Sequence, residues 1–188
     1  MEERLRRALA RRKKLRITDP ERTASAVLVP LYLKDGQYHV LFIQRTYNVR
    51  DHKGQIAFPG GTREEADNSL LATALREASE EVGLPAEAVD ILGELDDVRT
   101  IGSRYVISPF VGMVRRPFEV LVDEWETEDV IEVPLQALLD PACLRTGTDE
   151  LDGEPIKTYF YHYRDKVIWG ATARILAQLL DIIRGLAA

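Results

Sequence analysis

The chain has 188 residues, of which 45% are hydrophobic and 30% charged, and its formal net charge is −6. This length and composition are ordinary for one globular domain with a substantial core. The single cysteine, Cys143, excludes an internal disulfide, and no apolar run reaches the length of a membrane span or of a secretory signal, so we expect a cytoplasmic protein.

The chain begins with a basic arm, residues 1–16, in which a helix is predicted over about residues 3–14. Eight Lys or Arg and two Glu give this arm a charge of +6, and the net charge of −6 then leaves −12 for the remainder. A basic arm is typical of contact with nucleic acid or an anionic membrane. We favour the alternative of a solvated helix packed on the domain, because the acidic remainder argues against a nucleic-acid-binding protein.

Two strands and a helix are predicted next. The strands cover about residues 24–33 and 37–45, around an Asp35-Gly36 turn that is typical of a hairpin. A loop then continues to Gly61. A helix follows over about residues 69–82, with Asn68 or Ser69 as its cap and with Gly83 and Pro85 as its stop.

The second half of the chain continues as mixed strand and helix, which predicts an α/β fold. A short helix is expected after the strand that ends at Pro134, and a closing amphipathic helix over about residues 170–185. The predicted strands cover about residues 89–95, 104–114, 117–122, 129–133 and 156–161.

The helix at 69–82 carries the most informative pattern of the chain. Glu77, Glu80 and Glu81 are spaced i, i+3 and i+4, so their carboxylates share one face. Crowded carboxylates repel each other unless cations neutralise them, and oxygen ligands suit Mg²⁺ or Mn²⁺. The opposite face is apolar and should pack on the core through Leu71, Ala74, Leu75, Ala78 and Val82.

These residues resemble the Nudix box, a glycine followed after a spacer by Glu and then by Arg-Glu-apolar-x-Glu-Glu-x-Gly-apolar. Residues 76–84 match every fixed position of the second half, and Gly61 supplies the leading glycine. Two departures occur: Asp67 stands where the box has Glu, and the spacer before Arg76 carries one extra residue. The resemblance implies the Nudix fold, a mixed β-sheet sandwiched between α-helices, as a single domain over residues 1–188.

A second motif, residues 45–61, resembles the signature that precedes the box in the coenzyme A diphosphatase subfamily of Nudix hydrolases. Thr46 and Ile43 depart from the residues usual there, and the later segment 168–173 resembles the start of the terminal helix in these proteins. Physical reasoning agrees, since arginine forks match phosphate oxygens and glycines let a ligand approach the backbone. The predicted substrate-binding residues are Arg45, Arg50, Lys53, Gly60 and Gly61.

The resemblance implies metal-dependent hydrolysis of a diphosphate, with phosphopantetheine and adenosine bisphosphate as the products from coenzyme A. Glu77, Glu80 and Glu81 are then the ligands of Mg²⁺ or Mn²⁺, and Arg76 pairs with Glu80 to orient it. The general base comes from the box, where Glu77 is the candidate, or from a later acidic loop, where Glu126 is the choice.

Three alternatives stay open at this point. The chain could instead act on another nucleoside diphosphate compound such as ADP-ribose or NADH, bind nucleotides without catalysis, or use the basic arm for interaction with a decayed site. The segment 45–54 argues against the first alternative and the intact Glu77, Glu80 and Glu81 against the second, whereas salt-dependent binding to nucleic acid or anionic lipid would reveal the third. We expect a small-molecule substrate and no nucleic-acid or membrane partner, and we leave a homodimer open.

Overall fold

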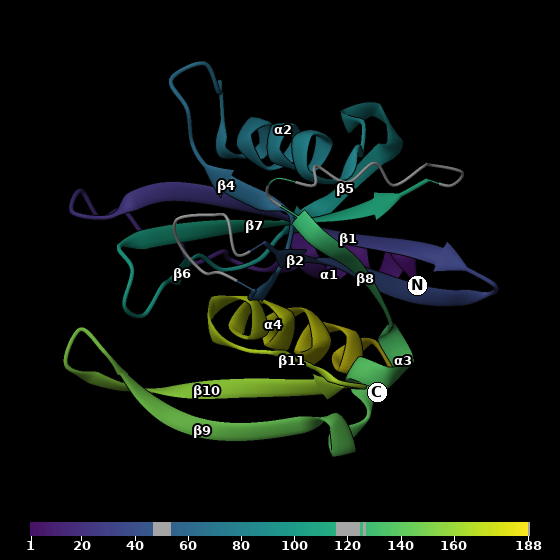
Figure 1. Ribbon diagram of the computed structural model, residues 1–188. Coiled ribbons are helices and arrows are strands. Elements are labelled where there is room, and N and C mark those ends of the chain that lie inside the picture. The colour runs from purple at the N-terminus through teal and green to yellow at the C-terminus, as the bar shows by residue number, and fades with distance from the viewer. Residues whose placement is uncertain (47–53, 116–124, 126, 188) are drawn as a thin grey trace.

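The computed structural model describes residues 1–46, 54–115, 125 and 127–187. The described chain forms stacked layers (Figure 1). Helix α2 (Leu70–Val82) covers one face of an eight-stranded sheet, helix α4 (Gly170–Ala187) covers the other, and a three-stranded sheet lies beyond α4. This confirms the α/β Nudix fold, with a mixed sheet between helices.

The large sheet is mixed because β1 has neighbours of both directions. It runs parallel to β7 (Tyr105–Val114) and antiparallel to β2 (Gln37–Arg45). The hairpin between β1 and β2 turns at Asp35 and Gly36 as predicted, and both residues have positive φ. The path is β3-β2-β1-β7-β5, with β4 paired to β1, β6 to β7 and β8 to β2. The strands are β1 (Thr23–Lys34), β2 (Gln37–Arg45), β3 (Ile56–Ala57), β4 (Gly60–Thr62), β5 (Val89–Glu94), β6 (Val98–Arg99), β7 (Tyr105–Val114) and β8 (Thr127–Pro134).

Successive side chains of each strand point to opposite faces of the sheet, and this divides the core into two apolar clusters. Val40 and Phe42 of β2 belong to the cluster that contains α4, whereas Leu41 and Ile43 belong to the cluster that contains α2. Helix α2 contributes Ala74, Ala78 and Val82 to its cluster, as predicted, while Leu71 and Leu75 are only partly buried. The sheet is therefore fixed between the two helices, and the acidic face of α2 is held at a defined place.

The ends of α2 follow local signals. The Ser69 side chain accepts the N–H of Ala72 at 3.1 Å, which makes it the cap. Gly83 has a φ of 67°, and its N–H donates to the carbonyl of Ser79 at 3.0 Å. Glycine adopts this left-handed conformation without steric cost, so the helix ends where the sequence predicts.

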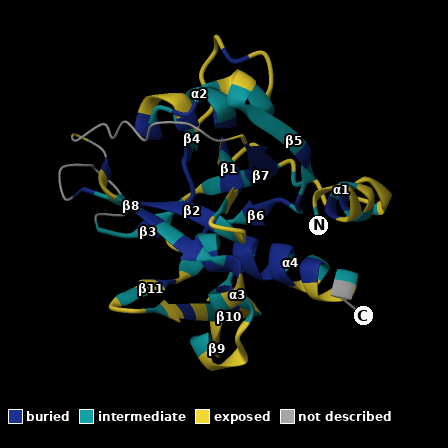
Figure 2. Cartoon of the chain, turned by 90° about the vertical axis from the view of Figure 1, so that its right-hand side faces the viewer, coloured by how far each residue is buried: buried dark blue, intermediate teal, exposed yellow. Residues whose placement is uncertain are grey.

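The three-stranded sheet has the order β11-β10-β9, and only part of it was predicted. Its strands are β9 (Leu144–Leu151), β10 (Glu154–Tyr163) and β11 (Lys166–Ile168). Figure 2 shows that β9 is largely exposed, which explains why no apolar alternation marks it. Several contacts connect this sheet to the large one and its flanking residues: Arg22 Nη2 donates to Asp152 at 2.6 Å, Arg99 lies 3.8 Å from Asp152, and Lys166 donates to Gln44 at 2.8 Å.

The basic arm packs on the domain. Helix α1 (Glu2–Arg11) buries Leu5 and Leu9, and it ends three residues before the predicted boundary. Three basic side chains of the arm form ion pairs with strand β5 or the residues just after it: Arg6–Asp90 (2.7 Å), Arg12–Asp96 (2.8 Å) and Lys14–Glu94 (2.7 Å). These pairs agree with the packed-helix interpretation rather than with an arm that reaches for a polyanion.

Several smaller elements complete the fold. Helix α3 (Leu135–Leu139) follows Pro134 as expected, and the single turns η1 (Ala86–Ala88) and η2 (Pro141–Cys143) are additional. The segment 46–61 was predicted as a loop, but its described end contains the short strands β3 and β4. The predicted strand at 117–122 lies outside the described residues. No helix in the described part of the chain is both long and apolar enough to cross a membrane.

Candidate active site

A two-glycine turn brings the main chain against the acidic face of α2. Gly60 has a φ of +156°, and a Cβ there would lie 2.3 Å from the carbonyl oxygen of Ala26 on the paired strand. A Cβ at Gly61 would lie 2.4 Å from Oε1 of Glu77. The Gly60 contact is with backbone, so that position requires glycine, whereas a side chain at Gly61 would displace the Glu77 carboxylate. The absence of side chains lets a carboxylate lie directly on the backbone.

Glu81 is the most deeply placed carboxylate of the site. Its side chain is 2% exposed, and Oε2 accepts the N–H of Gly60 at 2.9 Å. Nη1 of Arg45 approaches Oε1 at 3.4 Å. A buried carboxylate needs such partners, because burial without hydrogen bonds or a countercharge is costly. The structure thus joins Arg45, Gly60 and Glu81, which come from three separate parts of the sequence.

Arg76 holds the remaining acidic side chains together. Its guanidinium lies 3.0 Å from Glu77 and 2.9 Å from Glu80, the latter being the i, i+4 pair that the spacing predicts. It also donates to both carboxylate oxygens of Asp67 at 3.1 Å and to the carbonyl of Thr62. Arg76 is therefore fixed from several sides.

Asp67, the residue that departs from the Nudix box, is the main anchor of Arg76. The hydrogen bonds from Arg76 hold the pKa of the Asp67 carboxyl well below its ordinary value, with help from the Glu64 N–H and the Thr73 hydroxyl. The same contact raises the pKa of Arg76. The sequence showed Asp67 only as a mismatch, because nothing in the spacing reveals a contact between a loop residue and a helix residue.

The carboxylates of the site suit a hard divalent cation, although the described side chains do not form a complete set of ligands around one point. Within the described part of the chain, no three His, Cys, Asp or Glu side chains converge closely enough to hold an ion together. Glu77 and Glu81 lie beside the Gly60–Gly61 turn, whereas the Glu80 side chain is 58% exposed and bound to Arg76. Carboxylate oxygens are nonetheless the donors that Mg²⁺ and Mn²⁺ prefer, so the residues fit such an ion.

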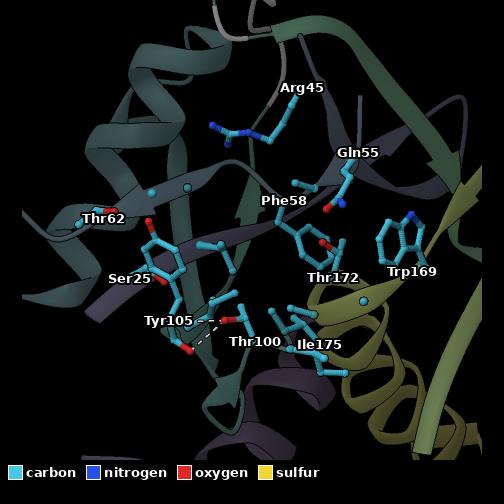
Figure 3. Close-up of a pocket in the computed structure, with 18 of the residues that line it drawn as sticks. Ser25, Arg45, Gln55, Phe58, Thr62, Thr100, Tyr105, Trp169, Thr172 and Ile175 are labelled. Carbon is cyan, nitrogen blue, oxygen red and sulfur yellow. Dashed lines mark hydrogen bonds between the residues drawn. The ribbon is translucent and has the colours of Figure 1, made fainter. Parts of the chain in front are cut away.

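A cavity of about 630 Å³ opens beside the glycine turn (Figure 3). One end carries Arg45, Gly60, Gly61 and Thr62, and the side chain of Arg45 points toward this space in the figure. The far wall comes from β10 and the start of α4. The cavity is lined by Ser25, Val27, Arg45, Gln55, Ala57, Phe58, Gly60, Gly61, Thr62, Thr100, Ile101, Tyr105, Ile107, Trp125, Asp149, Thr158, Phe160, Trp169, Gly170, Ala171, Thr172 and Ile175.

The predicted site residues are distributed unevenly over this geometry. Arg45, Gly60 and Gly61 line the cavity, and the three glutamates with Arg76 lie on α2 beside the glycine turn. Arg50, Lys53 and Glu126 lie outside the described residues, so their predicted roles stay predictions. The far wall of the cavity was not predicted as part of the site, because its side chains come from elements distant in sequence.

Comparison with known proteins identifies the family. A family model for the NUDIX domain matches residues 22–153. The chain belongs to the Nudix hydrolase family. It is 37% identical over 169 residues to the uncharacterized Nudix hydrolase NudL of Photorhabdus laumondii, covering 90% of this chain and 89% of that protein. A NudL protein of Yersinia pestis is 35% identical over 155 residues, covering 82% of this chain and 77% of that one.

Solved structures of Nudix proteins share the fold. A MutT/nudix family protein from Enterococcus faecalis superposes with a TM-score of 0.60 at 15% identity, covering 94% of this chain and 66% of its own. The NUDIX domain of Shewanella oneidensis NrtR, solved in complex with ADP ribose, gives 0.52 at 23% identity, covering 65% and 81%. As a Nudix hydrolase, the chain is a hydrolase of phosphoric anhydrides, and Nudix hydrolases generally use divalent ions such as Mg²⁺ or Mn²⁺.

Proposed function

We propose that this Nudix hydrolase cleaves the diphosphate of coenzyme A or a derivative, giving phosphopantetheine and adenosine bisphosphate. The observation that carries the proposal is the position of Arg45. The first arginine of the coenzyme A diphosphatase signature lies on the cavity wall, and its guanidinium lies next to Glu81 of the Nudix box. A planar guanidinium there can bind phosphate oxygens beside the carboxylates that we propose as metal ligands.

The roles of the acidic face follow from its contacts. Glu77, Glu80 and Glu81 would hold Mg²⁺ or Mn²⁺, which when bound neutralises the diphosphate and acidifies a water. Arg76 holds Glu77 and Glu80 in position through contacts of 3.0 and 2.9 Å. Glu77, packed against Gly61, is our candidate for a base within the box, and Glu126 our candidate in the later loop.

The roles on the substrate side belong to the phosphate end of the cavity. Arg45 anchors the diphosphate, and Gly60 and Gly61 leave room for it to approach the backbone. Arg50 and Lys53 are proposed as further phosphate ligands from the same signature. The Nudix domain of NrtR binds ADP ribose, which keeps a second candidate in view: another nucleoside diphosphate compound with the same linkage.

We expect the reaction to run in the cytoplasm, and the only cysteine, Cys143, is compatible with a reducing compartment. The substrate is a small molecule, and nucleic acid and membranes are not expected as partners, since the basic arm is engaged in ion pairs with the domain. A homodimer stays a prediction, to be measured by light scattering.

The deciding experiment compares substrates directly. The purified chain is incubated with Mg²⁺ or Mn²⁺ and, in parallel, with coenzyme A, dephospho-coenzyme A, ADP-ribose or NADH, and the products are identified by mass. We expect the highest kcat/KM for coenzyme A, with phosphopantetheine as a product. A tenfold or greater preference for ADP-ribose or NADH would overturn the coenzyme A assignment and leave the family intact. Binding without turnover of any compound would favour a nucleotide sensor.

A further inference from the structure

Three exposed aromatic rings line the cavity, two of them on its far wall. Trp125, Phe160 and Trp169 are 69%, 36% and 46% exposed, and they are all the exposed Trp and Phe residues in the described part of the chain. All three line the one cavity that begins at Arg45. Exposed aromatic rings gathered at a cavity mark a binding surface, since leaving them in water forgoes the free energy of their burial.

Two of these rings come from the part of the chain that follows the family match. The family match ends at residue 153, whereas Phe160 lies on β10 and Trp169 immediately precedes α4. The contacts of Asp152 with Arg22 and of Lys166 with Gln44 hold this segment against the large sheet. Phe160 and Trp169, the aromatic wall of the cavity, are thus held beside the large sheet, in a position to recognise the part of the substrate that does not react.

Polar groups accompany the rings. Gln55 and Thr172 line the cavity, and Figure 3 shows both side chains on the side that carries Trp169. A glutamine amide presents a donor and an acceptor that match the N6 and N7 edge of adenine. A purine nucleotide requires a phosphate-binding group at one end, flat rings at the other and a hydrogen-bonding group for the edge of the base. Arg45, the aromatic rings and the Gln55 amide meet these requirements.

We propose that Trp169 and Phe160 stack on the purine base of the substrate, with Gln55 and Thr172 contacting its edge. The assignment rests on the proposed function, because it divides the substrate at its diphosphate: the aromatic wall takes the nucleoside half and leaves the other half to the rest of the cavity. A pantetheine chain has no aromatic ring, so it would gain less than a purine from contact with exposed indole and phenyl rings. Trp169 is accordingly a determinant of specificity rather than a catalytic residue.

The first test measures ligand binding at Trp169 in the absence of catalysis. Trp125→Phe leaves Trp169 as the only tryptophan of the chain, and chelator prevents metal-dependent turnover. Adenosine 3′,5′-bisphosphate and 4′-phosphopantetheine are titrated separately while indole fluorescence is followed. We expect saturable quenching by the adenosine compound and none by phosphopantetheine. Quenching by phosphopantetheine alone, or by neither compound, overturns the assignment.

Kinetics supply the second arm. Trp169→Ala should raise KM for an adenine-containing substrate about tenfold or more with kcat little changed, whereas Trp169→Phe should retain most of the affinity, since stacking depends on a flat ring. Val167→Ala is the matched control, because Val167 is similarly exposed on β11 and does not line the cavity. An unchanged KM in a folded Trp169→Ala protein refutes the stacking role.

The two proposals fail in distinguishable ways. If the adenosine compound quenches Trp169 while coenzyme A is not hydrolysed, the base site stands and the substrate assignment falls. If coenzyme A is hydrolysed while the adenosine compound leaves Trp169 fluorescence unchanged, the base site falls and the reaction stands.

Discussion

Replacement of Gly61 by alanine tests the acidic face most directly. The new Cβ would lie 2.4 Å from Oε1 and 2.7 Å from Oε2 of Glu77, so the carboxylate must move by about 1 Å to reach ordinary contact distance. Glu77 is the end of a flexible side chain, so this movement costs little stability. Because displacements of about 1 Å in an active site cost roughly a hundredfold in rate, we expect kcat to fall about a hundredfold.

The assay is the steady-state hydrolysis of coenzyme A, or of the best substrate found, with Mn²⁺ and with thermal unfolding measured in parallel. Gly185→Ala is the matched control: a Cβ there meets no atom within 4 Å, and the residue lies in α4, where alanine is favoured. We expect Gly61→Ala to lose rate while its Tm stays near that of the parent. A Gly61→Ala protein with the parent's kcat would refute the argument that Glu77 must lie against this turn.

Three further variants test the other contacts. Arg45→Ala should raise KM about ten- to a hundredfold with a smaller effect on kcat, as expected for one charge-assisted phosphate contact of about 1.5–3 kcal/mol; a change in kcat alone would contradict the anchoring role. Glu81→Gln should reduce turnover by orders of magnitude, and chelator should abolish turnover of the parent. The control Glu87→Gln, on the exposed turn η1, should leave turnover unchanged. Activity in chelator would disprove metal dependence. The folded-state pKa of Asp67 lies below its ordinary value of 3.8, so the stability that the Asp67 carboxylate contributes is present above pH 3.8 and is lost as the pH falls toward the folded-state pKa. Asp67→Asn should therefore flatten the decline of Tm below pH 4. Parallel curves of Tm against pH for parent and variant would show that the contact contributes nothing.

Local signals explain what the sequence could predict. The hydroxyl of Ser69, the left-handed Gly83 and the Asp35-Gly36 turn each specify a boundary within a few residues, and the structure confirms all three. The apolar face of α2 was predicted through Ala74, Ala78 and Val82, because helical spacing reports burial against a core. These features depend on neighbours in the chain, which a single sequence contains.

The parts that escaped prediction depend on distant residues or lack an apolar signal. Strand β9 is exposed along nearly its whole length, so its residues carry no alternation of polar and apolar types. Two features arise only when separate elements pack together: Asp67 pairs with Arg76, and Trp169 lines the same cavity as Arg45. Motif spacing predicts the end of the cavity that we propose to react, whereas its far wall is recognisable only in the fold.

The contacts of the acidic face also change the electrostatic argument made from its sequence. Crowded glutamates on one helix face were expected to need metal cations, but the described structure supplies guanidinium groups: Arg76 beside Glu77 and Glu80, and Arg45 beside Glu81. The two arginines therefore offset part of the negative charge of Glu77, Glu80, Glu81 and Asp67. In the reaction proposed above, a divalent ion on these carboxylates would share them with the two arginines. Arg76 is also bonded to Asp67, whereas Arg45 is the arginine that we propose for the phosphate oxygens of the substrate.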